Sequence, residues 1–222
     1  MSATNEINKS AFLKELHRVF GSYRAEWTQG DIFTYFKRPG YFTALEEFQP
    51  CVLQGGRGSG KTTALQGLSY EGQFALNGND IVKFDSNVNY IGLYNKVDTN
   101  HVRAFCGANL DEAVWGKLFG HYFNLIVLLK ISGFILWHHS QSPDESMLTP
   151  QIMLRILKTL CISSNVCENY DQFRLMIEDG LWDFQTIINN IGSYKCDEVQ
   201  LSTTGDPIKY CIACLKELPQ FS

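Results

Sequence analysis

Residues 55–62 combine glycines, a lysine and a threonine at the spacing G-x-x-x-x-G-K-[ST], the pattern of a phosphate-binding loop. Glycines at such positions let backbone N–H groups turn toward a phosphate, because no Cβ atom stands in the way. The pattern therefore predicts a site for the phosphates of a nucleoside triphosphate. The predicted nucleotide-binding residues are Gly55, Gly56, Arg57, Gly58, Ser59, Gly60, Lys61, Thr62 and Thr63.

Two side chains of this loop supply chemistry that backbone amides cannot. The ammonium group of Lys61 is expected to reach the β- and γ-phosphates, which makes Lys61 the predicted catalytic residue. The hydroxyl of Thr62 is the predicted ligand of Mg²⁺. Arg57 either contacts a phosphate or faces solvent, and we favour solvent for a loop arginine. The sequence therefore predicts ATP and Mg²⁺ as cofactors.

A phosphate-binding loop needs a strand before it and a helix after it, and the flanking residues fit both. Residues 51–53 are a short apolar run typical of a buried strand, and residues 62–68 can open a helix whose N-terminus attracts phosphate. Residues 90–94 predict a second buried strand. We therefore expect an α/β fold, namely a P-loop NTPase core with a parallel sheet, rich in helices and incomplete at its C-terminus.

Hydrolysis also requires an acidic residue at the end of a second strand, where it helps to hold Mg²⁺. Three segments offer a carboxylate after apolar residues, at Asp85, at Asp98 and at residues 178–179. Polar residues interrupt the first two runs. The third lies between a helix-start signal at Asn169 and a helix-stop signal at Gly180, so we interpret it as a solvated helix end. No clear Mg²⁺ carboxylate emerges.

Residues 95–98 match N-K-x-D, the motif with which GTP-binding proteins read guanine. An aspartate at that position accepts two hydrogen bonds from the base. However, no D-x-x-G switch motif lies between Lys61 and Asn95, although GTPases place that motif before the guanine motif. We therefore favour ATP over GTP and interpret these residues as the polar end of a strand.

Apolar spacing and cap residues predict several helices. Their starts are marked by a capping pattern at residues 109–112, by the proline after Thr149, by Asn169 and by Asp206 before Pro207. The predicted helices cover residues 8–29, 109–139, 149–161, 169–180, 181–191 and 206–218.

The apolar stretch 123–137 raises the question of a membrane span. It contains Asn124 and Lys130, and it is shorter than the roughly 20 apolar residues that a spanning helix needs. We therefore expect a buried core helix and no membrane contact.

The predicted organisation is an N-terminal helical arm and aromatic lead-in over residues 1–48, followed by a nucleotide-binding domain over residues 49–222. This domain carries a helical insertion at residues 109–195. Only two strands are convincing, whereas a sheet has about five on average. Because the chain also ends just after a predicted helix, we expect it to be the N-terminal part of a longer ATPase.

Composition places the chain among globular proteins. Of its 222 residues, 45% are hydrophobic, which is enough for a core. The net charge of −4 argues against a broadly basic surface that coats nucleic acid. Cysteines number seven, an odd count, and the polar N-terminus lacks the apolar core of a signal peptide. These features predict reduced thiols and a cytoplasmic location.

Two pairs of residues resemble metal ligands. The C-x-x-C formed by Cys211 and Cys214 lacks the second ligand pair of a zinc site, so we expect these thiols to pack in the interior. His138 and His139 are adjacent on a predicted helix and point in different directions, so a surface or capping role is favoured.

Lys37 and Arg38 stand among aromatic residues that precede the loop. Such a cluster either stacks on a base or packs the entry to the sheet. We favour packing, because most aromatic residues of a globular protein serve the interior.

The sequence resembles the bacterial P-loop ATPases of the origin-recognition, initiator-type branch of the AAA+ class. The resemblance covers roughly residues 33–130 and is most specific in the phosphate-binding loop. It rests on residues 35–45, 50–54, 55–63, 97–100 and 118–125.

The resemblance implies an ATP-binding domain with Lys61 on the phosphates and Thr62 on Mg²⁺. Members of that group also have an acidic strand motif, an arginine sensor and a helical lid, for which this sequence shows no match. By analogy, the resemblance implies a role in a DNA-linked process, including defence against phage.

Three functions of different classes follow from these observations. The first is the ATP-binding module of an AAA+-like ATPase, which couples ATP binding or hydrolysis to a DNA-linked or defence-related process, with DNA or protein partners and self-assembly. The second is a nucleotide or small-molecule kinase, although Arg103, Arg155 and Arg174 form no clustered lid pattern. The third is a non-hydrolysing nucleotide-binding interaction module.

Overall fold

The computed structural model describes residue 33 and residues 36–47, 49–107, 110–143, 147–162, 165–193, 199–202 and 206–216. The helix predicted over residues 8–29 lies outside this part of the chain. The described helices are α2 (Phe42–Glu46), α3 (Lys61–Gly67), α4 (Tyr70–Leu76), α5 (Ile81–Asn87), α6 (Thr99–Arg103), α7 (Glu112–Gln141), α8 (Pro150–Thr159), α9 (Tyr170–Asn189), the 3-10 turn η3 (Ile191–Ser193) and α10 (Asp206–Lys216).

The prediction of an α/β fold with a parallel sheet is wrong, because the described residues form helices and connecting segments without a β-strand. The first predicted strand, residues 51–53, is largely solvent-exposed, and Val52 keeps 84% of its surface accessible. The second, residues 90–94, is extended, and its Gly92 carbonyl accepts a hydrogen bond from the amide of Tyr70 at 2.9 Å. An apolar run becomes a buried strand only where neighbouring strands complete its backbone hydrogen bonds, and the described residues supply none.

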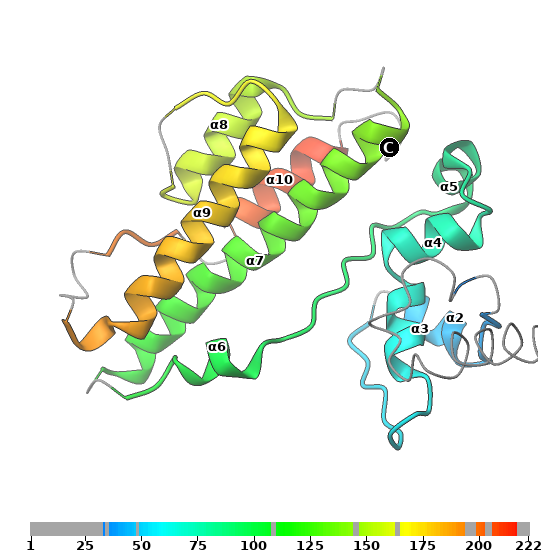
Figure 1. Cartoon of the computed structure of the whole chain (residues 1–222), viewed down its shortest axis with the longest axis horizontal. Helices are drawn as coiled ribbons and strands as arrows, with labels where there is room; N and C mark the ends of the chain where they lie inside the picture. Colours follow the sequence, from blue (N-terminus) through cyan, green and yellow to red (C-terminus); the bar gives the residue numbers. More distant parts are fainter. Residues whose placement is uncertain are drawn as a thin grey trace, which may run out of the picture. The chain divides into compact units, whose positions relative to one another are not determined.

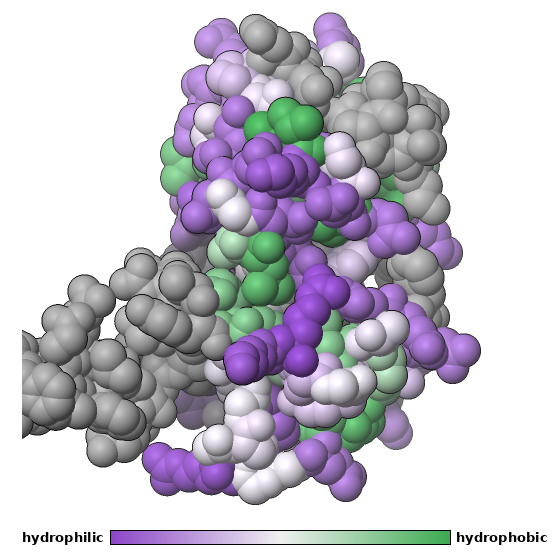
Figure 2. Space-filling view, turned by 90° about the vertical axis from the view of Figure 1, so that its right-hand side faces the viewer, coloured by the Kyte–Doolittle hydropathy of each residue, from purple (hydrophilic) through white to green (hydrophobic). Residues whose placement is uncertain are grey.

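The chain divides into two compact units, residues 1–94 and residues 95–222, and each is described here by itself. The first contains α2 to α5, and the second contains α6 to α10 (Figure 1). Figure 2 shows one face of the molecule, where hydrophobic patches lie among mostly hydrophilic residues.

In the first unit, α3 and α4 meet through glycines. Ser69 begins α4, because its Oγ accepts a hydrogen bond from the amide of Gly72 at 3.2 Å and donates one to the carbonyl of Gln66 at 2.8 Å. A Cβ atom on Gly72 would overlap the Gln66 carbonyl oxygen, and one on Gly67 would lie 3.3 Å from the ring of Phe36. A side chain at Gly72 would therefore force α4 away from α3, and one at Gly67 would displace the ring of Phe36.

In the second unit, α7 is the central helix, and α9 lies beside it along much of its length (Figure 1). Both α8 and α10 pack onto this pair. The buried residues of α9 recur at helical spacings of three, four and seven, which places them on one face. The core side chains of the two central helices are Leu118, Tyr122, Leu125, Leu128, Ile131, Phe134 and Ile135 of α7 and Phe173, Ile177, Phe184 and Ile188 of α9.

Helix α7 contains the apolar stretch 123–137. By length and composition alone this helix could cross a membrane, but 56% of its most apolar window is buried inside the protein. Apolar residues are spread around the helix, as expected where other helices cover several of its faces. The burial supports the prediction of a core helix.

The predicted cap residues mark three helix starts correctly. Thr149 Oγ1 accepts a hydrogen bond from the amide of Ile152 at 3.3 Å, Asn169 Oδ1 accepts one from Gln172 at 2.8 Å, and α10 begins at Asp206. The N-cap residue of α7 is Asp111. The cap predicted at residue 109 lies outside the described residues.

The predicted helix stop at Gly180 is wrong, because α9 runs unbroken from Tyr170 to Asn189 and replaces two predicted helices. A Cβ atom on Gly180 would lie 2.9 Å from the side chain of Ile162. The segment after α8 passes so close to α9 that only glycine fits at position 180. This glycine therefore serves packing and does not end the helix.

Candidate functional site

The phosphate-binding loop lies between an exposed, extended segment and α3 in the first unit. Gly58 and Gly60 adopt φ angles of 81° and 79°, in the left-handed region that side chains disfavour. Gly60 is the N-cap residue of α3, and its carbonyl accepts the first helical hydrogen bond, from Ala64, at 2.9 Å. The glycines of the motif therefore shape the turn that leads into the helix.

The ammonium group of Lys61 lies inside this loop. It donates hydrogen bonds to the carbonyl of Gly55, to the carbonyl of Gly56 at 2.8 Å and to Ser59 Oγ at 3.3 Å. A lysine ammonium has three protons, and these three acceptors satisfy all of them. The loop itself therefore holds the ammonium group of Lys61, through two backbone carbonyls and the Ser59 hydroxyl.

The remaining loop residues fit a phosphate ligand in type and exposure. Arg57 is exposed, in keeping with the interpretation of a solvent-facing loop arginine, and Thr62 and Thr63 are half-buried in the first turn of α3. A Cβ atom on Gly55 would lie 2.7 Å from Ser59 Oγ, so a larger residue at that position would displace Ser59. The loop therefore combines a cation, a hydroxyl and close backbone approach, which are the groups that a Mg²⁺–triphosphate requires.

The acidic candidates for Mg²⁺ do not stand at strand ends in the described structure. Asp85 lies within α5, and Glu178 and Asp179 lie in the middle of α9. The prediction of a helix is correct for this last pair, but the prediction that the pair lies at the end of that helix is wrong. Asp98 is the N-cap residue of α6, and its Oδ1 accepts a hydrogen bond from the amide of Asn100 at 2.8 Å. A helix cap, rather than a strand end, explains the aspartate of the N-K-x-D match.

The cluster around Arg38 is a packing element. Its guanidinium lies 5.0 Å from the ring centre of Phe42, 3.5 Å from a carboxylate oxygen of Glu46 and 3.3 Å from Gln73 Oε1. Phe42 is 1% exposed, and Phe36 meets it edge-on with ring centres 5.7 Å apart. These contacts support the prediction that the aromatic residues before the loop pack the interior.

The candidate metal ligands serve the interior of the second unit. Cys211 is fully buried, and burial, with Cys214 as the lesser cause, raises the pKa of its thiol to about 12. The surface role predicted for the histidine pair is wrong for His138, which is fully buried, while the ring of His139 meets Tyr170 edge-on. Among the described residues, no group of three or more potential ligands could hold a metal ion.

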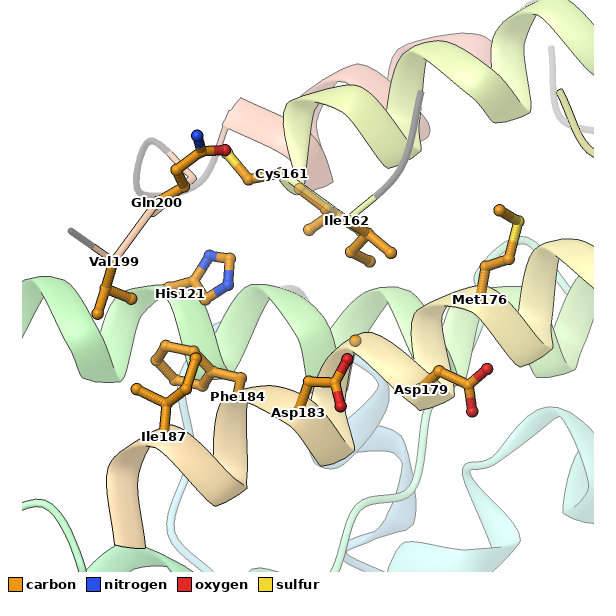
Figure 3. Close-up of a pocket in the computed structure, with 12 residues that line it drawn as sticks. His121, Cys161, Ile162, Met176, Asp179, Asp183, Phe184, Ile187, Val199 and Gln200 are labelled. Carbon is orange, nitrogen blue, oxygen red and sulfur yellow. The ribbon is translucent and has the colours of Figure 1, made fainter. Parts of the chain in front are cut away.

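One feature that no sequence motif indicates is a cavity of about 580 Å³ in the second unit, lined in part by His121, Asp179 and Asp183 (Figure 3). These residues come from α7 and from two successive turns of α9. The only local signal is the pair of aspartates four positions apart, which places two carboxylates on one helix face.

Comparison with protein-family models matched the ORC-CDC6-like family over residues 18–222, which extends the resemblance seen at residues 33–130 to nearly the whole chain. Comparisons with curated proteins and with solved structures gave no match. The family match includes the phosphate-binding loop of the first unit and all described helices of the second. The chain belongs to the ORC-CDC6-like family.

Proposed function

We propose that this chain binds ATP with Mg²⁺ through residues 55–63 and acts as the nucleotide-binding module of an ATPase in a DNA-linked or defence-related process. The observation that carries the proposal is the loop itself, in which Gly58 and Gly60 adopt left-handed φ angles and the ammonium group of Lys61 bonds to the Gly56 carbonyl and to Ser59 Oγ. The ORC-CDC6-like family indicates an AAA+-type ATPase module and the use of ATP and Mg²⁺ in general.

In this proposal, Lys61 moves from the carbonyls of Gly55 and Gly56 to the β- and γ-phosphates. The backbone amides of the loop then face the phosphates, since the left-handed glycines leave the space that side chains would fill. The hydroxyl of Thr62 holds Mg²⁺, which neutralises charge on the phosphates when it is bound.

Removing the lysine is expected to weaken ATP binding at least tenfold. A hydrogen bond to a charged group contributes about 1.5–3 kcal/mol, which corresponds to roughly 10–100-fold in affinity. The measurement is calorimetric titration of wild type and Lys61→Ala with ATP and with GTP, in the presence of Mg²⁺.

The matched control is Lys83→Ala, which removes an equal charge from the same unit. Among the described residues, Lys83 forms an ion pair only with Asp80 on the surface, at 3.3 Å, so this variant should bind ATP like wild type. Equal affinity in wild type and Lys61→Ala, or no binding by wild type, contradicts the proposal. Preference for GTP would instead favour the N-K-x-D interpretation.

A second candidate function is nucleotide binding without hydrolysis. The observation that favours it is the location of Asp85, Asp98 and Asp179 within helices or at a helix cap, rather than at a strand end beside Mg²⁺. Turnover assays on the same proteins distinguish the two. ATP hydrolysis that Lys61→Ala abolishes supports the ATPase, whereas tight binding without turnover supports the binding module.

A further inference from the structure

The cavity in the second unit has the size and lining of a small-molecule site. It is an open pocket that lies against α7 and α9, and the segment after α8 and residues 199–200 also line it (Figure 3). Its volume of about 580 Å³ falls within the range of small-ligand pockets. Met176, Phe184 and Ile187 supply apolar lining, and the polar lining comes from His121, Asp179, Asp183 and Gln200.

The hydrogen bonds of His121 determine which ring nitrogen carries its proton. Nδ1 accepts a hydrogen bond from the backbone amide of Ser202 at 3.0 Å and lies 2.8 Å from Ser202 Oγ. Because an amide N–H can only donate, Nδ1 must present its lone pair. Ser202 Oγ itself accepts a hydrogen bond from Asn124 Nδ2 at 2.9 Å, which leaves its proton for His121. The imidazole is therefore neutral, with its proton on Nε2.

This Nε2–H is a donor that an acceptor atom in the cavity can reach. His121 is only 5% exposed, and its ring faces the cavity (Figure 3). Within the described residues, the hydrogen bonds of His121 all involve Nδ1, and its ring meets the Phe184 ring edge-on with ring centres 4.6 Å apart. A ligand with an acceptor atom here would gain a hydrogen bond, whose net contribution is about 0.5–1.5 kcal/mol.

The opposite side of the cavity carries two carboxylates. Asp179 and Asp183 lie four residues apart on α9, and Figure 3 shows them on the same side of the helix. Both are solvent-exposed, and neither has an ion pair with another described residue. Glu178, their neighbour, differs because it pairs with Arg174 at 3.6 Å. Two unpaired negative charges beside a cavity attract a cation and repel a phosphate.

An organic cation fits this arrangement better than a metal ion. The described residues contain no group of three or more His, Cys, Asp or Glu side chains that could hold a metal. A guanidinium group, by contrast, presents several N–H donors in one plane and pairs with carboxylates through two parallel hydrogen bonds.

We propose that this cavity binds a small organic cation of the guanidinium class that also carries a hydrogen-bond acceptor. Its cationic end pairs with Asp179 and Asp183, its acceptor receives the Nε2–H of His121, and its alkyl body lies against Phe184 and Met176. The site is independent of the phosphate-binding loop, which belongs to the other unit.

The test is calorimetric titration of the full chain with Nα-acetyl-L-arginine methyl ester, which has a guanidinium, an alkyl stem and carbonyl acceptors. The matched probe is the citrulline analogue, which has nearly the same shape without the charge. We expect the arginine probe to bind wild type and the citrulline probe to bind at least about tenfold more weakly, because a charge-assisted pair becomes a neutral one. The signal of the His121 ring in NMR spectra should shift on addition of the arginine probe.

Protein variants locate the binding. Asp179→Asn and Asp183→Asn should each weaken the arginine probe at least about tenfold and leave the fold intact, because both side chains are exposed. Glu178→Gln on the same helix removes an equal charge that is already paired, and it should leave the affinity unchanged. Equal binding of both probes, equal weakening by Glu178→Gln, or no binding at millimolar concentration overturns the proposal.

Discussion

Replacing Gly92 with alanine is expected to destabilise the unit that carries the phosphate-binding loop by about 3 kcal/mol, the upper end of the cost of overpacking. The new Cβ atom would overlap the carbonyl oxygen of Leu68 and lie 2.8 Å from its carbonyl carbon and 3.1 Å from Ser69 Cα. These are backbone atoms at the end of α3, so no side-chain rotation can relieve the contact. The clash also threatens the hydrogen bond from Tyr70 to the Gly92 carbonyl, which joins the extended segment to α4.

Hydrogen exchange of the backbone amides in α3 and α4, followed by mass spectrometry, measures this effect within the affected unit. A loss of about 3 kcal/mol corresponds to exchange faster by roughly 100-fold where local opening controls it. The matched control is Gly56→Ala, because a Cβ atom there would meet nothing within 4 Å, and exchange should stay close to wild type. Unchanged exchange in Gly92→Ala would show that residues 90–94 do not pack on the end of α3.

The features that the sequence predicted correctly depend on neighbouring residues. A helix cap joins positions about three apart, so Thr149 and Asn169 could be identified without knowledge of the fold. The turn at Gly58 and Gly60 is equally local, because the left-handed conformation is a property of the glycine backbone.

The features that the sequence did not predict depend on distant contacts. In the sequence, Gly180 resembles a helix stop, and only the structure shows that it makes room for Ile162. Residues 90–94 resemble a strand, and only the structure shows that the carbonyl of Gly92 accepts a hydrogen bond from Tyr70 at the start of α4. The cavity is the strongest case. His121 and Asp183 are far apart in the sequence, and only the packing of α7 against α9 brings them around one space.

The same packing makes His121 a source of pH-dependent stability. Burial lowers the pKa of His121 from 6.5 to about 4, because the charged imidazolium would lose its hydration. The hydrogen bond from the Ser202 amide to Nδ1 also requires the neutral ring. The folded protein therefore keeps His121 neutral at pH values at which the unfolded chain already binds a proton.

The direction of the effect follows from this difference. Since the folded pKa is lower than the unfolded one, the contribution of His121 is fully present above pH 6.5 and is lost as the pH falls from 6.5 to about 4. Over that interval the loss amounts to about 3 kcal/mol, at 1.36 kcal/mol for each pKa unit. Below pH 4 the folded protein also binds the proton, and the contribution changes no further.

His121→Gln provides the comparison, because its amide oxygen can still accept the hydrogen bond of Ser202 but does not titrate. Urea denaturation followed by the fluorescence of Trp115, Trp137 and Trp182 reports the stability of the second unit at pH 7 and at pH 4.5. We expect wild type to lose about 2.5 kcal/mol more than His121→Gln between these two pH values. Carboxylates that protonate over the same range affect both proteins equally, so the difference isolates the histidine. Parallel losses in the two proteins would mean that His121 accepts a proton in the folded state as readily as in the unfolded chain, and that its ring is not held neutral by Ser202 and burial.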